Sequence, residues 1–296
     1  MVISNTKIGD IILFGYENEY IFTQLKKGEL YEQDILIQWK KYISNSSVIY
    51  DIGANLGNHT VFFAKTFDKS EIFSFEPIVK NFELLKKNCD VNECNNVKIF
   101  NIGIGEKDSK GIAKDDIDSN YGSIQVEFNP DGDIHIKSID NMDLPNPQFI
   151  KIDVEGFEIS VLRGMLKTIE ISKPTIWIEV RVDTFIEVNK ILTQLDYSII
   201  EYSKFNVLYM YKGNSVINEK IFSDYLINLD NTWKYRESSM KNHSAYLYEK
   251  KLLVNSKNKN SDLENKNSDL ENKNSDLENK NSDLENKNSD LENKNS

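Results

Sequence analysis

Short apolar runs alternate with amphipathic stretches through the middle of this chain. Runs rich in Val, Ile and Phe predict buried strands, and apolar residues at helical spacing predict helices. The expected strands are 48–52, 71–75, 97–101, 148–152 and 175–180, and the expected helices are 57–66, 78–88 and 157–168. This alternation favours a parallel sheet with helices on both faces.

The segments around this core have weaker patterns. Residues 1–47 predict a short β-rich start and a helix at 32–42, and a helix at 184–195 precedes two edge strands, 197–202 and 206–211. Alternating apolar and polar residues predict exposed strands at 122–128 and 134–138. A turn at Asp131-Gly132-Asp133 would join these two strands into a hairpin over the mouth of a crevice.

The C-terminal end is a heptad repeat. The sequence Asn-Lys-Asn-Ser-Asp-Leu-Glu recurs unchanged from Asn258 to Glu292. Each heptad has a single leucine, and an Asn occupies the other seam position, which weakens a coiled coil severely. Both a helical stalk that supports homo-oligomers and a solvated, partly disordered tail remain open. The expected organisation is a main domain at 1–213 (core 48–213, N-terminal cap 1–47), a helical extension at 214–257 and the tail at 258–296.

Composition narrows the class of protein. The chain has 296 residues, 39% of them hydrophobic, and a net charge of −11, which argues against nucleic acid as a general partner. Its two cysteines, Cys89 and Cys94, lack the further ligands of a zinc site and are expected to be reduced thiols. No signal peptide or membrane span is recognised in the sequence, so a cytoplasmic location is expected.

The most informative segment is a strand, glycine turn and helix that begin at Val48. Gly53 and Gly57 allow a tight turn beside a ligand, a geometry typical of nucleotide cofactor sites. A dinucleotide site would need a third glycine near position 55 and would not place a carboxylate, Asp51, near a pyrophosphate. S-adenosylmethionine has no phosphate, and its ammonium can bind a carboxylate. Glu76, at the end of the next strand, suits both ribose hydroxyls. Alternatively, Asp51 and Glu76 are only strand-end caps.

A second acidic turn follows the strand at 148–152. Asp153 and Glu155 lie at its carboxyl end, where a substrate would approach the cofactor, and Gly156 permits the turn into the next helix. One of these carboxylates could take the proton of an acceptor hydroxyl. Together they could instead hold a divalent metal ion, or be acids favoured by the helix dipole, as Glu158 is.

Other polar residues are weaker candidates. His59 is either a base or, as we favour, a structural residue at a helix start. Glu179 is expected to face the acceptor pocket, and Lys151 to pair with one of the acids. Tyr31 and Glu32 are interpreted as a packing aromatic and a helix-start acid, with a role in a lid as the alternative. His135 and His243 are expected at the surface.

An ordered set of motifs resembles the FkbM-type methyltransferases. The motifs are Asp51–Thr60, Phe75-Glu76-Pro77, Asn101–Gly105, and Ile152–Glu158 with Leu162-Arg163-Gly164. The resemblance covers about residues 28–212. It implies a class I (Rossmann-like) methyltransferase fold, an α/β fold whose seven-stranded sheet has the order 3-2-1-4-5-7-6 with strand 7 antiparallel.

The resemblance also implies S-adenosylmethionine as the methyl donor and O-methylation of a hydroxyl on a sugar or polyketide. Asn101 to Gly103 would lie against the adenine. The cofactor-binding residues expected from this match are Asp51, Gly53, Ala54, Asn55, Gly57, Asn58, Thr60, Glu76, Pro77, Ile102 and Gly103. The assignment of Asp153 or Glu155 as the base is an inference from position, and the heptad tail lies outside the family pattern.

The leading hypothesis is therefore an O-methyltransferase that acts on a sugar hydroxyl, as in the synthesis of bacterial surface glycans. The alternatives are an NAD-dependent oxidoreductase on a similar fold and a non-catalytic scaffold that presents a coiled-coil stalk.

Overall fold

The structure is a computed structural model that describes residues 2–6, 9–16, 24–114, 124–212, 221 and 224–229. The chain divides into two compact units, Met1–Ser238 and Ser239–Ser296. The second unit lies outside the described residues, as do the heptad tail, His243 and most of the helical extension predicted for 214–257. The proposed domain boundaries and the state of the tail stay predictions.

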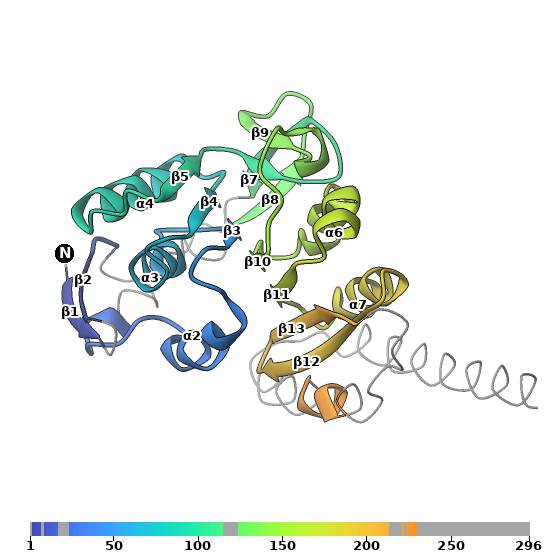
Figure 1. The fold of residues 1–296 in the computed structure, drawn as a ribbon. Helices are drawn as coiled ribbons and strands as arrows, with labels where there is room; N and C mark the ends of the chain where they lie inside the picture. Colours follow the sequence, from blue (N-terminus) through green and yellow to red (C-terminus); the bar gives the residue numbers. More distant parts are fainter. Residues whose placement is uncertain are drawn as a thin grey trace, which may run out of the picture. The chain divides into compact units, whose positions relative to one another are not determined.

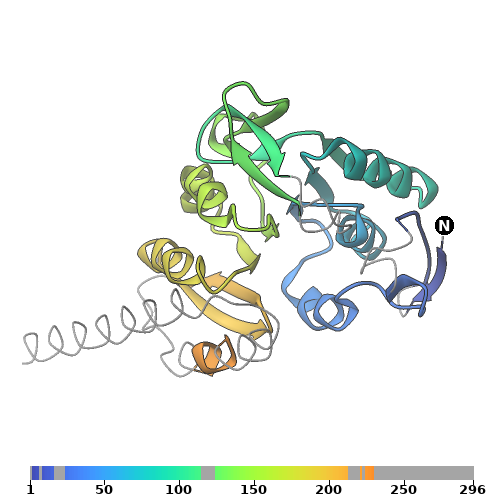
Figure 2. The ribbon, with the colours of Figure 1, turned by 180° about the vertical axis from the view of Figure 1, so that it is seen from behind.

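Seven strands form the central sheet of the described part of the chain (Figures 1 and 2). Their spatial order is β12 (Tyr197–Ser203), β13 (Asn206–Tyr211), β11 (Thr175–Glu179), β10 (Phe149–Ile152), β3 (Val48–Ile52), β4 (Glu71–Phe75) and β5 (Val97–Phe100). The strands from β11 to β5 are parallel, whereas β13 is antiparallel to both of its neighbours. This order and the direction of β13 confirm the fold that the sequence motifs implied.

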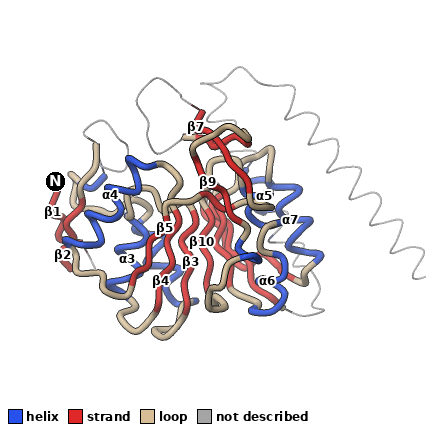
Figure 3. The backbone as a smooth tube through the Cα atoms, turned by 90° about the horizontal axis from the view of Figure 1, so that it is seen from above, coloured by secondary structure: helices blue, strands red, loops and turns tan. Residues whose placement is uncertain are grey.

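Helices cover both faces of this sheet (Figure 3). One face packs against α2 (Gln33–Trp39), which continues into the short helix η1 (Lys40–Tyr42), and against α3 (Asn58–Thr66) and α4 (Val79–Val91). The other face packs against α5 (Glu158–Arg163), α6 (Leu166–Ser172) and α7 (Phe185–Gln194). Successive residues of a strand point to opposite faces. Ile49 therefore lies in the core on the α3 side, while Tyr50 and Ile52 lie in the core on the α7 side.

The helix predicted for 157–168 is interrupted. It forms two helices, α5 and α6, with Gly164 between them. A Cβ atom at Gly164 would lie 1.9 Å from the carbonyl oxygen of Gly105, so only glycine allows this close approach. Asp140 then caps α6, since its carboxylate accepts hydrogen bonds from the N–H groups of Lys167 and Thr168. The break follows from a contact with a distant segment, which helical periodicity does not record.

The predicted hairpin of 122–128 and 134–138 is wrong in its pairing. The second sheet has the order β6 (Gly103–Ile104), β9 (Ile134–Lys137), β7 (Ser109–Lys114) and β8 (Gln125–Phe128). Strand β7 lies between the two expected partners and pairs antiparallel with both. A turn does form near Asp131, where Gly132 packs against the carbonyl oxygen of Gly111. The turn therefore connects β8 to β9, which lie on opposite sides of β7 in the sheet. Figure 3 shows β7 and β9 at one end of the central sheet.

The N-terminal hairpin of β1 (Val2–Thr6) and β2 (Gly9–Leu13) is attached to α4 by asparagine side chains. The Asn88 side chain accepts a hydrogen bond from the N–H of Phe14 (2.7 Å) and donates to the carbonyl oxygens of Phe14 (3.0 Å) and Leu56 (2.7 Å). Asn92 makes the same reciprocal pair of bonds with Ile12. Asn88 thus joins the N-terminal segment to the glycine turn after β3.

Further expectations concerned the two cysteines, His135 and membrane-spanning helices. Cys89 and Cys94 are free and buried. His135 is exposed on β9, as predicted. Within the described residues, the search for membrane-spanning helices found none of sufficient length and apolarity.

Substitution Asn88→Ala should lower the free energy of unfolding by about 1–3 kcal/mol, because it leaves buried backbone groups of Phe14 and Leu56 without partners. Urea unfolding monitored by circular dichroism measures the change. Asn95→Ala is the control, because Asn95 is exposed in the loop before β5. Its free energy of unfolding should stay within about 0.5 kcal/mol of that of the unchanged protein. Equal losses in both variants would contradict the role given to Asn88.

Candidate functional site

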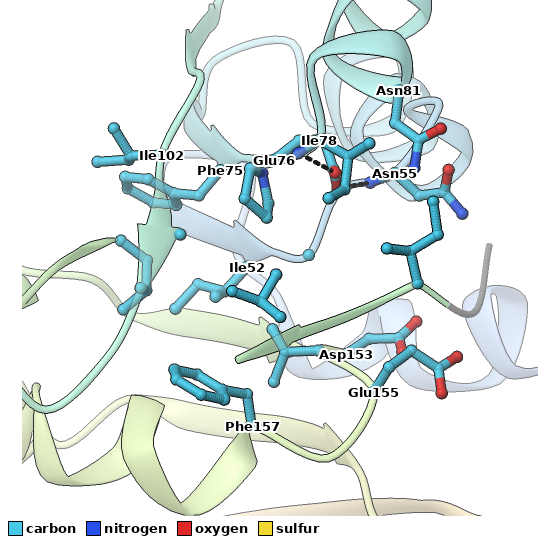
Figure 4. A pocket seen from close by; sticks show the side chains of 17 residues that line it. Ile52, Asn55, Phe75, Glu76, Ile78, Asn81, Ile102, Asp153, Glu155 and Phe157 are labelled. Carbon is cyan, nitrogen blue, oxygen red and sulfur yellow. Dashed lines mark hydrogen bonds between the residues drawn. The ribbon is translucent and has the colours of Figure 1, made fainter. Parts of the chain in front are cut away.

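A cavity opens at the carboxyl ends of β3, β4 and β10, where ligands bind in open α/β sheets. Its empty volume, including the open mouth, is about 670 Å³. The residues that line it are Ile52, Gly53, Asn55, Phe75, Glu76, Pro77, Ile78, Asn81, Ile102, Gly103, Ile104, Ile124, Val126, Asp153, Val154, Glu155 and Phe157. Figure 4 shows Glu76 and Asn55 on one side and Asp153 and Glu155 on the other. The two acidic turns predicted from sequence therefore share one cavity.

The glycine turn after β3 is fixed by contacts with both neighbouring strands. The N–H groups of Gly53 and Ala54 donate to the carbonyl oxygen of Phe75 at the end of β4 (3.0 Å each). Gly53 has φ +82°, and a Cβ atom there would lie 1.8 Å from the carbonyl oxygen of Asp153. Asn55 and Gly57 also have positive φ, at 50° and 93°. The turn thus needs glycine at position 53 for its conformation and for its contact with the next strand.

Glu76 is held in place by backbone groups at the wall of the cavity. Its carboxylate accepts hydrogen bonds from the N–H of Asn55 (2.8 Å) and from the N–H of Ile78 (2.9 Å), which Figure 4 draws as dashed lines. Burial raises the pKa of Glu76 to about 7, and those two bonds oppose the rise. Two carboxylate oxygens have about four acceptor positions, so further hydroxyl groups can bind there.

Several residues of the predicted cofactor set lie behind the turn and outside the cavity lining. Asp51 is fully buried and its Oδ2 accepts a hydrogen bond from Thr60 (2.6 Å). The Asn58 side chain bonds the backbone of Tyr31 in both directions. Gly57 packs against Leu85 of α4, and Ala54 is buried. These residues therefore pack behind the turn and support it. The members of the predicted set that line the cavity are Gly53, Asn55, Glu76, Pro77, Ile102 and Gly103.

Asp153 and Glu155 lie on the opposite wall, in the turn between β10 and α5. Glu155 has φ 50° and Gly156 has φ 99°, so two successive residues adopt the left-handed conformation. For a glutamate this conformation is strained, and such strain concentrates at functional sites. The Glu158 carboxylate, which is buried, accepts a hydrogen bond from the N–H of Gly156 (2.6 Å) and stabilises the turn.

The carboxyl groups of Asp153 and Glu179 have pKa values shifted in opposite directions. Burial would raise the pKa of Asp153, but the ammonium of Lys151 and the ring of His59 hold it below its usual range. Burial and the Asp153 carboxylate raise the pKa of Glu179 well above its ordinary value. The two pKa shifts therefore have opposite directions, so Asp153 loses its proton more readily than an ordinary aspartate and Glu179 keeps its proton more readily than an ordinary glutamate.

Tyr31 and Glu32 lie at the start of α2, and both side chains contact His59. Glu32 precedes α2 with φ 55° and makes no side-chain cap bond. Its carboxylate lies 3.3 Å from His59 Nε2 and accepts a hydrogen bond from Asn206 Nδ2 (2.6 Å). Burial raises the pKa of Tyr31, and the carboxylates of Glu32, Glu179, Asp153 and Glu155 raise it further. Glu32 is therefore the acid at the start of α2, as expected, but its side chain contacts His59 and Asn206 and does not cap the helix.

No local motif marks Glu32 or Asn206, which are 174 residues apart. Ile124 and Val126 line the cavity, as expected of a segment over the mouth of the crevice, although the pairing predicted for its strand was wrong. For a metal ion, no suitable group of three His, Cys, Asp or Glu side chains occurs in the described part of the chain. The positive charge between Asp51 and Asp153 is the Lys151 ammonium, 3.8 Å and 3.0 Å from their oxygens.

The fold and the two-sided acidic cavity define the Rossmann-like methyltransferase class. A family model described as the methyltransferase FkbM domain matches residues 51–199, and the chain belongs to this family. Over 145 residues, the chain is 26% identical to the hexuronic acid methyltransferase AglP of Haloferax volcanii. That match covers 47% of this chain and 58% of AglP. Over 147 residues it is 24% identical to Methyltransferase 1 of Beauveria bassiana, a match that covers 41% and 59% of the two chains.

The chain thus spans under three fifths of the length of these curated relatives. A crystal structure of methyltransferase FkbM from Methylobacillus flagellatus is also similar. It has 24% identity and a TM-score of 0.43, and the match covers 57% of this chain and 44% of that one.

Substitution Gly53→Ala should lower the melting temperature much more than Gly28→Ala does. Both glycines have positive φ, but a Cβ atom at Gly28 meets nothing within 4 Å, whereas at Gly53 it meets the Asp153 carbonyl. Gly28→Ala should cost the strain of a left-handed residue, about 1–2 kcal/mol, and Gly53→Ala about 1–3 kcal/mol more for overpacking. Calorimetric melting measures both, and equal losses would contradict the close approach.

Proposed function

We propose that this protein is an S-adenosylmethionine-dependent O-methyltransferase that acts on a sugar hydroxyl. The observation that carries the proposal is the cavity itself, which has a carboxylate suited to a ribose on one wall and an ionised carboxylate beside the acceptor position on the other.

The cavity wall fits the methyl donor in three places. Glu76 retains acceptor positions for the ribose hydroxyls. Ile78, Ile102 and Gly103 offer apolar and backbone surface for the adenine. Asn55 Oδ1 is buried without a hydrogen-bond partner and suits the amino group at the methionine end. The donor carries a positive charge and no phosphate, so acids near the turn favour it over a dinucleotide.

The bound donor supplies an electrophilic methyl group on a sulfonium. The acceptor oxygen attacks the methyl carbon as the carbon–sulfur bond breaks, and the hydroxyl proton moves to a carboxylate. Asp153 is suited to receive it, because it is ionised, lines the cavity and lies at a strand end. Glu155, which lines the cavity beside Asp153, can orient the acceptor. Alignment of the two reactants supplies much of the rate.

A sugar acceptor is supported by the similarity to AglP, which is described as a hexuronic acid methyltransferase. A role in the synthesis of a bacterial surface glycan and a cytoplasmic location are parts of the same proposal. The heptad tail would add a homo-oligomer contact. Removal of the residues after Lys257 tests that contact by the mass in solution, and an unchanged oligomer would refute it.

Titration calorimetry of the full chain with S-adenosylhomocysteine and with NAD tests the donor assignment. The proposal expects binding of S-adenosylhomocysteine and none of NAD. The reverse result would indicate the oxidoreductase alternative, and binding of neither compound would indicate a scaffold. A screen of nucleotide sugars with isotopically labelled donor then identifies the acceptor.

The affinity for S-adenosylhomocysteine should fall as the pH is lowered from about 8 to 6, since the pKa of Glu76 is raised to about 7 and its ionised form accepts hydroxyl hydrogen bonds. Glu76→Gln should weaken binding by about tenfold or more and abolish this pH dependence. Glu83→Gln, at an exposed site on α4, is the control and should bind as the unchanged protein does. A pH-independent affinity in the unchanged protein would exclude this role.

Asp153→Asn should lower kcat by about 10²–10⁴-fold with donor affinity largely retained, because the amide cannot accept the hydroxyl proton. Glu155→Gln should raise KM for the acceptor more than it lowers kcat. Steady-state kinetics with the acceptor from the nucleotide-sugar screen measures both. Full activity in the two variants would refute the assignment of this turn as catalytic.

A further inference from the structure

Lys151 is a lysine at the centre of the sheet whose side chain is 1% exposed. We propose that Lys151 is a positioning residue whose ammonium keeps the Asp153 carboxylate charged and directed into the cavity. The inference rests on the proposed function, because it gives Asp153 the role of base. It extends that function by assigning a task to a residue that does not line the cavity.

The register of the sheet places Lys151 between an acid and an aromatic ring. Lys151 lies opposite Asp51 on β3 and opposite Trp177 on β11. All three side chains project toward the side of the sheet that packs against α3, since Ile150 and Ile152 project to the other side. Lys151 Nζ is 3.8 Å from Asp51 Oδ1 and 5.9 Å from the centre of the Trp177 ring.

The Lys151 side chain also contacts the turn after β10 that contains Asp153. Lys151 Nζ donates a hydrogen bond to Asp153 Oδ2 at 3.0 Å. Asp153 is two residues further along the same chain, where β10 has ended, and its side chain is 21% exposed. The bond therefore fixes one carboxylate oxygen, and the partly exposed carboxyl group still borders the cavity.

The other titratable groups near Asp153 are mostly acids. They are Asp51 from β3, Glu179 from β11, Glu155 from its own turn and Glu32 before α2, with the Tyr31 hydroxyl nearby. His59 from α3 is the other basic group, and it pairs with Glu32. Without the lysine charge, the negative charge of Asp153 would be surrounded mainly by other acids. Protonation of Asp153 would then relieve the electrostatic repulsion.

Stability alone does not account for a charged group here. Replacing a buried ion pair with apolar side chains of similar volume is often neutral or stabilising. The Lys151 ammonium therefore has a function that an apolar methionine could not perform. Its hydrogen bond to Asp153 indicates that this function is to keep Asp153 charged.

The test is the titration of Asp153 in the full chain labelled with ¹³C at aspartate carboxyl carbons. The Asp153 signal is assigned by its loss in Asp153→Asn. Lys151→Met should move its titration midpoint upward by at least about one pH unit, equivalent to 1.36 kcal/mol. A midpoint that stays in place would overturn the proposal.

A second variant guards against loss of the fold, because Lys151→Met leaves Asp51 unpaired. Lys151→Met/Asp51→Asn removes both charges and should still move the midpoint upward, though less, since the lysine is the nearer charge. Lys98→Met is the matched control. Lys98 Nζ is also 3.0 Å from a carboxylate, Glu71 Oε2, but this pair is exposed on the edge of the sheet. It should leave the Asp153 midpoint unchanged.

Turnover gives an independent readout. The acidic limb of the kcat–pH profile should move upward in Lys151→Met and recover toward the kcat of the unchanged protein at high pH. A uniform fall in kcat at every pH would indicate a merely structural lysine and contradict the proposal. Failure of the unchanged protein to bind S-adenosylhomocysteine would instead remove the proposed function, whatever the Asp153 titration shows.

Discussion

The site depends on the close backbone contact between the ends of β3 and β10. Gly53 lies so near the carbonyl oxygen of Asp153 that no side chain fits between them, and the Asp153 N–H donates to the Ile52 carbonyl oxygen. The glycine turn after β3 and the Asp153 turn after β10 are therefore held together by backbone contacts. A methyl transfer needs both reactants aligned to within a fraction of an ångström, and this contact fixes the two walls relative to one another.

The protein controls the charge of several buried carboxyl groups by giving each a different environment. Glu76 accepts hydrogen bonds from the backbone N–H groups of Asn55 and Ile78 and from the Asn81 side chain, and burial raises its pKa to about 7. The ammonium of Lys151 lowers the pKa of Asp153, whereas burial and the neighbouring acids raise the pKa of Glu179. Pairs of acids with separated pKa values are typical of acid–base sites. The acids that sequence motifs bring together thus have different tasks, which spacing alone does not reveal.

The sequence predicted those parts of the structure that depend on local pattern. Apolar runs predicted the seven strands of the central sheet, and the motifs predicted their order, the glycine turn, Glu76 and the Asp153 turn. Features that depend on distant contacts were missed. Strand β7 is a short polar segment around Gly111, whose place follows from two partners. Gly164 ends a helix because of Gly105, and Glu32 reaches the site through Asn206 on the last strand.

The central claim is that this cavity holds the methyl donor between Glu76 and Asp153. A crystal structure of the full chain with S-adenosylhomocysteine tests it most directly. The account predicts both ribose hydroxyls within hydrogen-bond distance of the Glu76 carboxylate and the sulfur directed toward the wall formed by Asp153 and Glu155. A ligand bound elsewhere, or one whose ribose lies away from Glu76, would contradict it.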